Sequence, residues 1–449
     1  MIQSNLKRFL PLVVLLGLTV YLSGRADADV VVRDIPHAPD WDVSSPVLIS
    51  DTANPNVNDR PYIAAGSNGN KLIIVYNRKM GSGNDKDPYF SRSTNGGQSW
   101  SSPAPIHTSL GEAFNSLEVN IEIDANNVGH AVWVEANNTI MYSKEGNWGN
   151  NSPTPIYNAI VQASSPQIVA SGSNTLDLIW TAADFGLTQV WHRRSTDGGN
   201  TWSSENAISP DNVEALFADV DVDDNGNLHV AWEQTDSVHP QTGSFIYYTK
   251  GTVAGSSINW STPVRVGDVS EASGPFPADS RSARRMVILT DGNRVHVAFT
   301  TFWEDEDLND SQWVHYATCY NSCQSSSNWT DDVSISGEVV SVNDNSPKYI
   351  VSDILKIRGC THVYFHGIDD TLEENEILLG VNSCDAWAAN GRDGVTSSQN
   401  QSLHTSLVAT DDHVHIVYEQ TGDDGSTRQI FYRRGTPPPF NLYLPVVAR

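Results

Sequence analysis

Two nearly identical stretches combine groups that enzymes use for catalysis. They are RSTNGGQSW, residues 92–100, and RSTDGGNTW, residues 194–202. A serine hydroxyl beside a carboxylate or amide could serve a nucleophilic site. The same residue types also suit a tight turn, because Asp or Asn bonds its own backbone, Gly tolerates a positive φ, and Trp buries a large surface. A reduced version recurs in SKEGNW, residues 143–148. We therefore interpret the pattern as a structural turn that the chain needs more than once.

Two other sets of residues could bind a metal ion. DVDDNGN, residues 221–227, matches the opening of a calcium loop, but position twelve of that loop would be Trp232, where glutamate is required. Five histidines take one position in successive repeats: His130, His229, His296, His362 and His415. A single metal site does not need five equivalent positions spread along a chain. We expect no metal and no other cofactor, and we assign the histidines to packing and hydrogen bonding.

Composition and charge narrow the class of protein. The 449 residues, 39% of them hydrophobic, can bury a large core, and a net charge of -26 disfavours nucleic acid as a partner. Lys7 and Arg8 precede the apolar run 9–22 and the small residues near Ala28, which is the pattern of a secretory signal. An uncleaved membrane anchor is the alternative. We expect a mature chain from Asp29 that is monomeric, secreted or at the cell surface, and without a membrane span once the signal is removed.

Repeats organise the rest of the chain. Seven short apolar runs each carry an aromatic residue near the end, and alignment places these residues in one column: Tyr76, Trp133, Trp180, Trp232, Phe299, Phe365 and Tyr418. The spacing is roughly 50 to 65 residues, in the range of propeller blades with some long loops. Around each run we expect an alternating strand before it, a third strand after it, and then a strand led by Trp. This order predicts an all-β fold, a β-propeller of four-stranded antiparallel blades.

The two ends of the repeat region complete each other. The seventh repeat has no Trp-led strand, whereas WDVSSPVLIS, residues 41–50, has that pattern but precedes the first repeat. The N-terminal strand can therefore close the last blade, which removes open sheet edges. We favour seven blades, with six as the alternative. The predicted organisation is a signal peptide at 1–28, the propeller at 29–435 and a tail at 436–449, Pro-rich at its start. Because the tail resembles C-terminal tails of exported proteins in some filamentous bacteria, we expect a bacterial protein. The tail is either a sorting or anchoring signal or a strand packed on the propeller.

Four cysteines in an exported chain can form two disulfides. Cys319 and Cys323 bracket a tight turn and should pair locally. Cys360 opens a second strand and Cys384 closes the third strand of the same repeat, so in an antiparallel pair they should face each other.

The turn motif resembles the Asp-box, or BNR repeat, of propellers in the sialidase superfamily, and this resemblance covers most of the mature chain. The likeness is most specific in the first repeat, in DRPYIA, VYNRKMGSGNDKD and SRSTNGGQSW. It implies that Arg60 would bind a substrate carboxylate, with Arg78 beside it and Asp85 or Asp87 as acid/base residue. A glutamate from a middle repeat, with Glu233 the best candidate, would activate a tyrosine nucleophile. Pro61 follows Arg60 directly, where sialidases have an intervening residue.

Strand direction locates the expected functional face. In a propeller of this kind the connections between blades and between second and third strands emerge on one face, and the turn motifs emerge on the other. On the first face we expect Arg60, Arg78 and Arg428 to converge, either on an anionic ligand or as structural ion pairs at strand ends. Two functions remain open: a sialidase-like glycoside hydrolase acting on terminal sugars, and a non-catalytic propeller that binds a glycan, a glycoprotein or another protein.

Overall fold

A computed structural model describes residues 42 to 436 apart from 51–57, 80–85, 109–116, 136–137, 151, 160, 184–185, 236–243, 268–280, 305–309, 331–332, 336–338, 342–349, 358, 370–373, 379–401, 411–412 and 422–426. All of these residues belong to one compact unit, His37–Arg449. None of its described helices has the length and apolar character that a bilayer crossing requires.

Almost all regular structure is antiparallel β-sheet, and each sheet except sheet 7 uses a continuous stretch of chain. Sheet 1 contains β3 (Asn58–Ala65), β4 (Leu72–Lys79), β5 (Lys86–Ser93) and β6 (Ala104–Pro105). Sheet 2 contains β7 (Leu117–Ile123), β8 (Gly129–Glu135), β9 (Thr139–Lys144) and β10 (Thr154–Asn158). Sheet 3 contains β11 (Gln162–Ala170), β12 (Leu176–Ala183), β13 (Gln189–Ser195) and β14 (Asn206–Ala207).

The later sheets repeat this order with additions. Sheet 4 contains β15 (Ala215–Val222), β16 (Leu228–Thr235), β17 (Ser244–Ala254), β18 (Ser257–Trp260) and β19 (Val264–Arg265). Sheet 5 contains β20 (Arg281–Asp291), β21 (Arg294–Glu304), β22 (Asp310–Tyr320), β23 (Val333–Ser334) and β24 (Val339–Ser341). Sheet 6 contains β25 (Ile350–Ile357), β26 (Cys360–Asp369) and β27 (Glu374–Leu378). Sheet 7 contains β28 (Ser402–Ala409), β29 (Val414–Thr421) and β30 (Arg428–Thr436), with β1 (Asp42–Val43) and β2 (Val47–Leu48).

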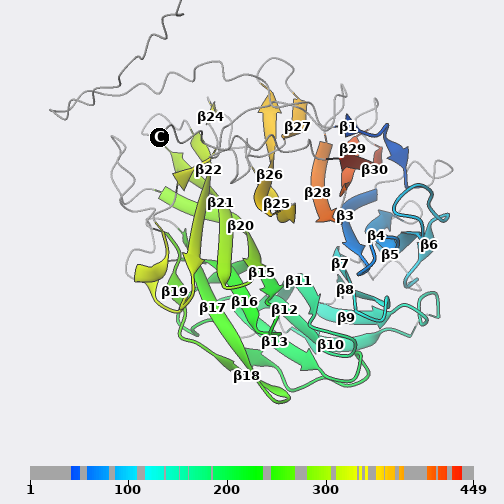
Figure 1. Cartoon of the computed structure of the whole chain (residues 1–449). Helices are drawn as coiled ribbons and strands as arrows, with labels where there is room; N and C mark the ends of the chain where they lie inside the picture. The colour runs from blue at the N-terminus through cyan, green and yellow to red at the C-terminus, as the bar shows by residue number, and fades with distance from the viewer. Residues whose placement is uncertain are drawn as a thin grey trace, which may run out of the picture. The chain divides into compact units, whose positions relative to one another are not determined.

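The first strand of each sheet is its inner strand, and the inner strands form a closed cycle. Each contacts the inner strands of the preceding and following sheets, and β28 contacts β3 (Figure 1). Within the described residues there are seven such sheets, six of which have four or more strands, while sheet 6 has three. This arrangement confirms the predicted all-β propeller of antiparallel blades.

The N-terminal segment closes the ring as predicted. Asp42 pairs with Thr436 and Val47 pairs with Tyr432, so β1 and β2 both lie along β30. Because strands from the two ends of the repeat region share sheet 7, the outer edge of β30 is covered by β1 and β2 and does not present unpaired backbone groups to other chains.

The second strand of each repeat is buried because both faces of its sheet pack against neighbouring sheets. Every residue of GHAVWVE in β8 and of LDLIWTAA in β12 is buried. Trp133, Trp180 and Trp232 are fully buried and come from the aromatic column of the sequence. The apolar clusters between sheets therefore hold the ring together.

The turn motifs make contacts within their own turns and to the preceding sheet. In sheet 1 the Gly97 amide donates to Ser93 Oγ over 2.9 Å, and in sheet 3 the Gly199 amide donates to Ser195 Oγ over 2.9 Å. The Trp that ends each motif packs on a tyrosine of the sheet before it. The ring centroids lie 4.8 Å apart for Trp100 and Tyr432 and 5.2 Å apart for Trp202 and Tyr142.

The histidine column supports these tyrosines. His130 Nδ1 lies 2.8 Å from Tyr142 Oη, and His229 Nδ1 lies 2.8 Å from Tyr248 Oη. His415 makes the same contact with Tyr432 over 2.7 Å. Histidine, tyrosine and the next sheet's tryptophan thus form a repeated joint between sheets, which agrees with the expected role of the histidines in packing and hydrogen bonding.

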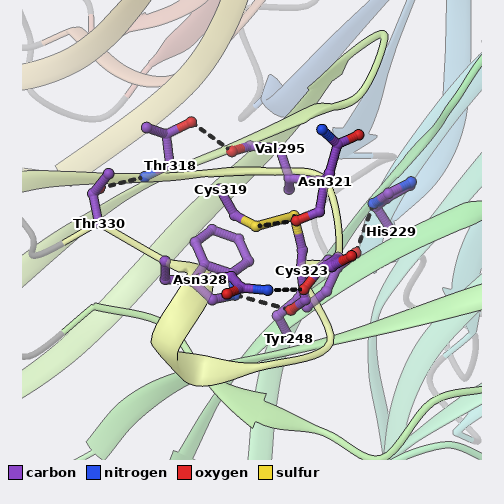
Figure 2. Close-up of a disulfide and its surroundings, with 11 residues drawn as sticks. His229, Tyr248, Val295, Thr318, Cys319, Asn321, Cys323, Asn328 and Thr330 are labelled. Carbon is purple, nitrogen blue, oxygen red and sulfur yellow. Dashed lines mark hydrogen bonds between the residues drawn. A yellow bond between two sulfur atoms is a disulfide. The ribbon is translucent and has the colours of Figure 1, made fainter.

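Cysteine pairing is confirmed for the local disulfide. Cys319 and Cys323 are bonded, with Cα atoms 5.7 Å apart, and both lie in the core between sheets 4 and 5 (Figure 2). Cys360 is also disulfide-bonded. Its predicted partner Cys384 lies outside the described residues.

Candidate functional site at the rim of the ring

Every inner strand carries a β-bulge near its start, where its register against the second strand shifts. In five successive sheets the bulge residue has a positive φ although it is not glycine. These residues, the bulge rim, are His404 (42°), Arg60 (51°), Glu118 (53°), Ser165 (50°) and Phe217 (49°). A residue other than glycine is strained at a positive φ, and such strain is often found at functional sites.

Arg60 and Glu118 connect the bulges of sheets 1, 2 and 3. Arg60 Nη1 lies 2.7 Å from Glu118 Oε1, and the two side chains are 39% and 29% exposed. The second carboxylate oxygen, Glu118 Oε2, accepts a hydrogen bond from the Ser165 amide. Three neighbouring bulges are therefore joined through one carboxylate.

Glu419 joins the rim of sheet 7 to that of sheet 1. This glutamate lies on β29 and its side chain is completely buried. Its Oε2 accepts a hydrogen bond from the Arg60 amide over 3.2 Å and lies 3.1 Å from His404 Nδ1. Its Oε1 forms an ion pair with Arg428 Nη1 over 3.0 Å. Glu419 is thus the point on which the Arg60 amide, the His404 imidazole and the Arg428 guanidinium, from two sheets, meet.

The environment keeps Glu419 ionised. Burial alone would raise the pKa of this carboxyl group, but the contacts with His404, Arg428 and the Arg60 amide outweigh burial and lower it. A buried carboxylate that carries its full charge can hold cationic side chains at the rim in fixed positions.

The structure brings together two of the three predicted arginines. Arg60 contacts Glu419 through its backbone amide and Arg428 contacts it through its guanidinium, and Asn58 Nδ2 donates to the Arg428 carbonyl over 3.0 Å. Arg78 on β4 places its guanidinium carbon 4.9 Å from the centre of the Tyr89 ring. Arg60 thus lies at the rim and also forms a structural ion pair with Glu118.

The predicted acidic residues have different positions. Asp85 lies outside the described residues. Asp87 is buried on β5, opposite Arg78 in the strand register. Glu233 is buried on β16 opposite Leu216, the residue before the Phe217 bulge.

Sequence reasoning missed Glu118, Phe217, His404 and Glu419. One signal was present for Glu419, because it directly follows Tyr418 just as Glu233 directly follows Trp232 in the aromatic column. The register confirms this equivalence, since Glu419 lies opposite Leu403, the residue before the His404 bulge. The other three residues could be found only by recognising the bulges.

Tyr62, two residues after Arg60, lies beside the same network. Burial, and then the charges of Glu118 and Asp219, raise its pKa to about 12, although a hydrogen bond with Gln167 and the charge of Arg60 act in the opposite direction. The phenol therefore stays protonated at neutral pH, which suits a hydrogen-bond donor better than a nucleophile.

Within the described part of the chain no group of His, Cys, Asp or Glu residues could hold a metal ion. The calcium-like stretch 221–227 forms a hydrogen-bonded turn. Asp223 Oδ1 accepts from the Asn225 amide over 3.0 Å and from the Asn227 amide over 2.9 Å. These contacts are those of a hairpin between β15 and β16.

Comparisons with known proteins place the fold. No protein-family model matches the sequence, and no curated protein matches it. An ulvan lyase of a polysaccharide lyase family, solved with bound -[GlcA(1-4)Rha3S]-, has a TM-score of 0.52 and 10% identity over 86% of this chain and 95% of its own. A protein of unknown function from Dyadobacter fermentans has a TM-score of 0.47 and 11% identity over 89% of this chain and 100% of its own.

A Trypanosoma rangeli sialidase in complex with the inhibitor DANA has a TM-score of 0.42 and 9% identity over 87% of this chain. The chain spans 57% of the length of that sialidase. At such low identity, the likeness to the ulvan lyase shows only the fold. That fold is the all-β propeller.

Proposed function

We propose that this protein is a glycan-directed propeller that binds a carboxylated sugar at the bulge rim. The observation that carries the proposal is that the Arg60 amide, the Arg428 guanidinium and the His404 imidazole meet at the buried carboxylate of Glu419, while the Arg60 guanidinium pairs with Glu118. The three side chains are 39%, 38% and 43% exposed, so each is fixed at one point and still reaches solvent. Guanidinium groups bind carboxylates by paired, charge-assisted hydrogen bonds.

The charge balance of the whole protein strengthens the argument. A chain with a net charge of -26 repels anions unless cations are concentrated at one place. Glu419 is completely buried, whereas the side chains of Arg60, Arg428 and His404 are partly exposed. The rim therefore offers donors to an anion while Glu419, one of its two balancing carboxylates, is shielded from it; the other, Glu118, is 29% exposed.

Binding measurements test the proposal. Calorimetric titration should show binding of a glucuronate-containing oligosaccharide or sialyllactose, and much weaker binding of neutral lactose. Arg60→Ala should weaken binding of the acidic sugar by about tenfold or more, because a charged contact is lost. The melting temperature should change little, since a half-exposed ion pair contributes at most about 1 kcal/mol.

Arg193→Ala is the matched control. Arg193 pairs with Glu205 in sheet 3, away from the rim, so this variant removes one cation without touching the cluster. Its affinity should equal that of the wild type. Equal affinity for acidic and neutral sugars, or a large loss of stability in Arg60→Ala with unchanged binding, would show that the arginines serve only as ion-pair partners.

Hydrolysis in the manner of sialidases is a second candidate, on the resemblance of the first repeat. Asp85 or Asp87 would then act as acid/base residue and Glu233 would assist a tyrosine. The observation that favours it is the position of Asp87 opposite Arg78 in the register of β4 and β5, which keeps an acid beside an arginine in the first repeat. A screen of chromogenic glycosides that includes sialosides decides between hydrolysis and binding alone.

We also propose that the protein is an exported bacterial monomer, with a signal at 1–28, a propeller at 29–435 and a sorting or anchoring tail at 436–449. The Cys319–Cys323 disulfide supports an oxidising compartment. N-terminal sequencing of the exported protein should begin near Asp29. A chain that retains residues 1–28 would instead indicate an uncleaved anchor.

A further inference from the structure

Glu118 is a partly exposed negative charge at a rim that is proposed to bind anions. It lies on the inner strand of sheet 2 and its side chain is 29% exposed, whereas the side chain of Glu419 is completely buried. Burial shields Glu419 from a bound anion. Glu118 lacks this shield, because it shares the surface of the rim with the arginine that it contacts. An acidic ligand that approaches Arg60 therefore meets a carboxylate of the protein at the same place.

Both oxygens of Glu118 have fixed partners. Oε1 lies 2.7 Å from Arg60 Nη1, in sheet 1, and Oε2 accepts a hydrogen bond from the Ser165 amide, in sheet 3. Contacts with the sheets on either side hold the side chain in one orientation, with Oε1 directed at the guanidinium. The carboxylate of an acidic sugar would make the same charge-assisted contact with Arg60. Before a ligand binds, Glu118 thus holds the place that such a carboxylate needs.

The backbone conformation indicates that glutamate is retained at this position for its side chain. Glu118 has a φ of 53°, a region in which glycine is relaxed and glutamate is strained. The turns at Gly97 and Gly199 also need a positive φ, and there the chain has glycine. The strain at Glu118 is therefore offset by what its carboxylate contacts, which is the Arg60 guanidinium and the Ser165 amide.

The Arg60 guanidinium keeps donors for a ligand. Nη1 is its one nitrogen with a partner among the described residues, and a guanidinium carries five N–H donors in all. A ligand carboxylate that pairs with two of these donors either takes Nη1 from Glu118 or binds directly beside Glu118 Oε1. In both cases two negative charges lie close together. They repel each other, although partial exposure to solvent screens the repulsion.

We propose that Glu118 is a built-in competitor of the ligand for Arg60, and that it sets the affinity of the rim for acidic sugars. Before a ligand binds, it neutralises a guanidinium that would otherwise attract any small anion. A ligand has to replace this contact, so an acidic sugar needs the contacts of its ring in addition to its carboxylate. The inference rests on the proposed function and deepens it, because it names the residue that limits binding at Arg60.

Calorimetric titration of Glu118→Gln with the glucuronate-containing oligosaccharide tests the inference. The glutamine amide oxygen can still accept from the Ser165 amide, while the charge that competes for Arg60 is gone. The variant should bind the oligosaccharide about tenfold more tightly than the wild type, because a like charge beside the ligand is removed. Its affinity for neutral lactose should not change. Acetate should inhibit binding of the oligosaccharide more strongly in this variant than in the wild type.

Three further variants show whether the gain acts through Arg60. Glu118→Asn removes the same charge with a residue that tolerates a positive φ, and it should also bind more tightly. Arg60→Ala/Glu118→Gln should bind within about twofold of Arg60→Ala, since no guanidinium is left to release. Glu205→Gln is the matched control. Glu205 pairs with Arg193 in sheet 3, so this variant loses one negative charge away from the rim and should keep the wild-type affinity.

The outcomes separate the two proposals. If Glu118→Gln and Glu118→Asn bind the oligosaccharide no better than the wild type, or if the gain persists without Arg60, the competition is overturned and the proposed function stands on the wild type's preference for acidic sugars. If neither the wild type nor the variants show this preference, the proposed function is overturned and the inference falls with it. A preference that arises only in the variants supports the competition and overturns the proposed function of the wild type. Tighter binding in both variants that depends on Arg60 supports the inference.

Discussion

Gly199 shows how closely the turn of sheet 3 packs against sheet 2. Its φ is 81°, and a Cβ atom at this position would lie 1.9 Å from Tyr142 Oη. Glycine is therefore required for two independent reasons, the backbone conformation and the space that the tyrosine occupies. Gly97 in sheet 1 requires glycine for the same two reasons. Its φ is 80°, and an added Cβ atom would lie 1.9 Å from Tyr432 Oη.

Gly199→Ala should lower the free energy of unfolding by about 2 to 4 kcal/mol, because it adds a collision to the backbone strain. Gly146→Ala is the control, since Gly146 has a φ of 101° but nothing lies within 4 Å of an added Cβ. That variant should lose only about 1 kcal/mol. Urea unfolding of both variants measures the difference, and equal losses would contradict the role of Tyr142.

The residues of the site could be predicted only in part. Arg60 and Arg428 were expected to converge because both begin strands at the same end of neighbouring sheets. Glu118 and His404 could not be found in this way, because a bulge changes which side chains of a strand reach the rim. Alternation along the sequence assumes a regular strand and fails at the point where the site is built.

At the level of elements, the disulfide of sheet 5 replaces the hydrogen-bonded turn of sheets 1 and 3. Cys319 lies opposite Val295, just as Ser93 lies opposite Leu72 and Ser195 opposite Leu176. The Cys319–Cys323 bond joins positions four residues apart, which is also the separation of Ser195 and Gly199.

The surroundings of the disulfide support the equivalence. The Thr330 amide donates to the Thr318 carbonyl over 2.8 Å, as the Ser203 amide donates to the Arg194 carbonyl over 2.8 Å. Trp329 packs on Tyr248 with ring centroids 5.2 Å apart. Tyr248 contacts His229 as described above (Figure 2). A covalent bond and a serine hydroxyl thus perform the same task in different sheets.

The double variant Cys319→Ala/Cys323→Ala should lose about 2 to 3 kcal/mol of stability. Hydrogen exchange should rise in residues 318–330 and at Tyr248, because the turn that positions Trp329 is released. Replacing residues 319–329 by the sequence of residues 195–202 should restore most of the loss. Exchange that rises throughout the protein, or a replacement no better than the alanines, would count against the equivalence.

The elements themselves were largely predictable. Three local features recur in each repeat: an alternating strand, a turn with Asn, Asp or Gly, and a strand with the column aromatic. In the described residues, the structure has strands at the alternating segments and at the aromatic runs. The closing of sheet 7 by residues 42–48 followed from the missing strand in the last repeat. The sequence pattern does not identify the equivalent turn of sheet 5, because a disulfide takes the place of the serine hydrogen bonds there and the turn is longer than the motif.

At the scale of the whole molecule, the inner strands bring acidic residues from several sheets together. Asp219 Oδ2 accepts from the Ile288 amide of the next sheet over 3.0 Å, and Asp353 Oδ2 accepts from the Leu407 amide over 3.0 Å. Burial, followed by the charges of neighbouring acids, raises the pKa of Glu122 to about 8, and burial likewise raises those of Asp219 and Asp353 to about 7. No sequence pattern shows this, because the carboxyl groups belong to three sheets and interact only once the ring has closed.

These acids predict a loss of stability as pH rises from 6.5 to 8.5. Each has a folded pKa above its unfolded value near 4, so its contribution is complete below that value and is lost as pH rises through 7 and 8. His229, His296 and His415 act in the opposite sense, since burial lowers their pKa to about 4, but their effect on stability ends near pH 6.5. Above pH 6.5 the acids therefore decide the slope.

We expect the free energy of unfolding to fall by about 3 kcal/mol across this window, since each acid still protonated contributes about 1.4 kcal/mol per pH unit. Urea unfolding at constant ionic strength measures it. Asp353→Asn should flatten the slope between pH 6.5 and 8, because the amide cannot ionise while its oxygen can still accept from Leu407. A stability that is constant or rises over this range would mean that the carboxyl groups of the inner strands are already ionised at pH 6.5, and that the ring tolerates their charge.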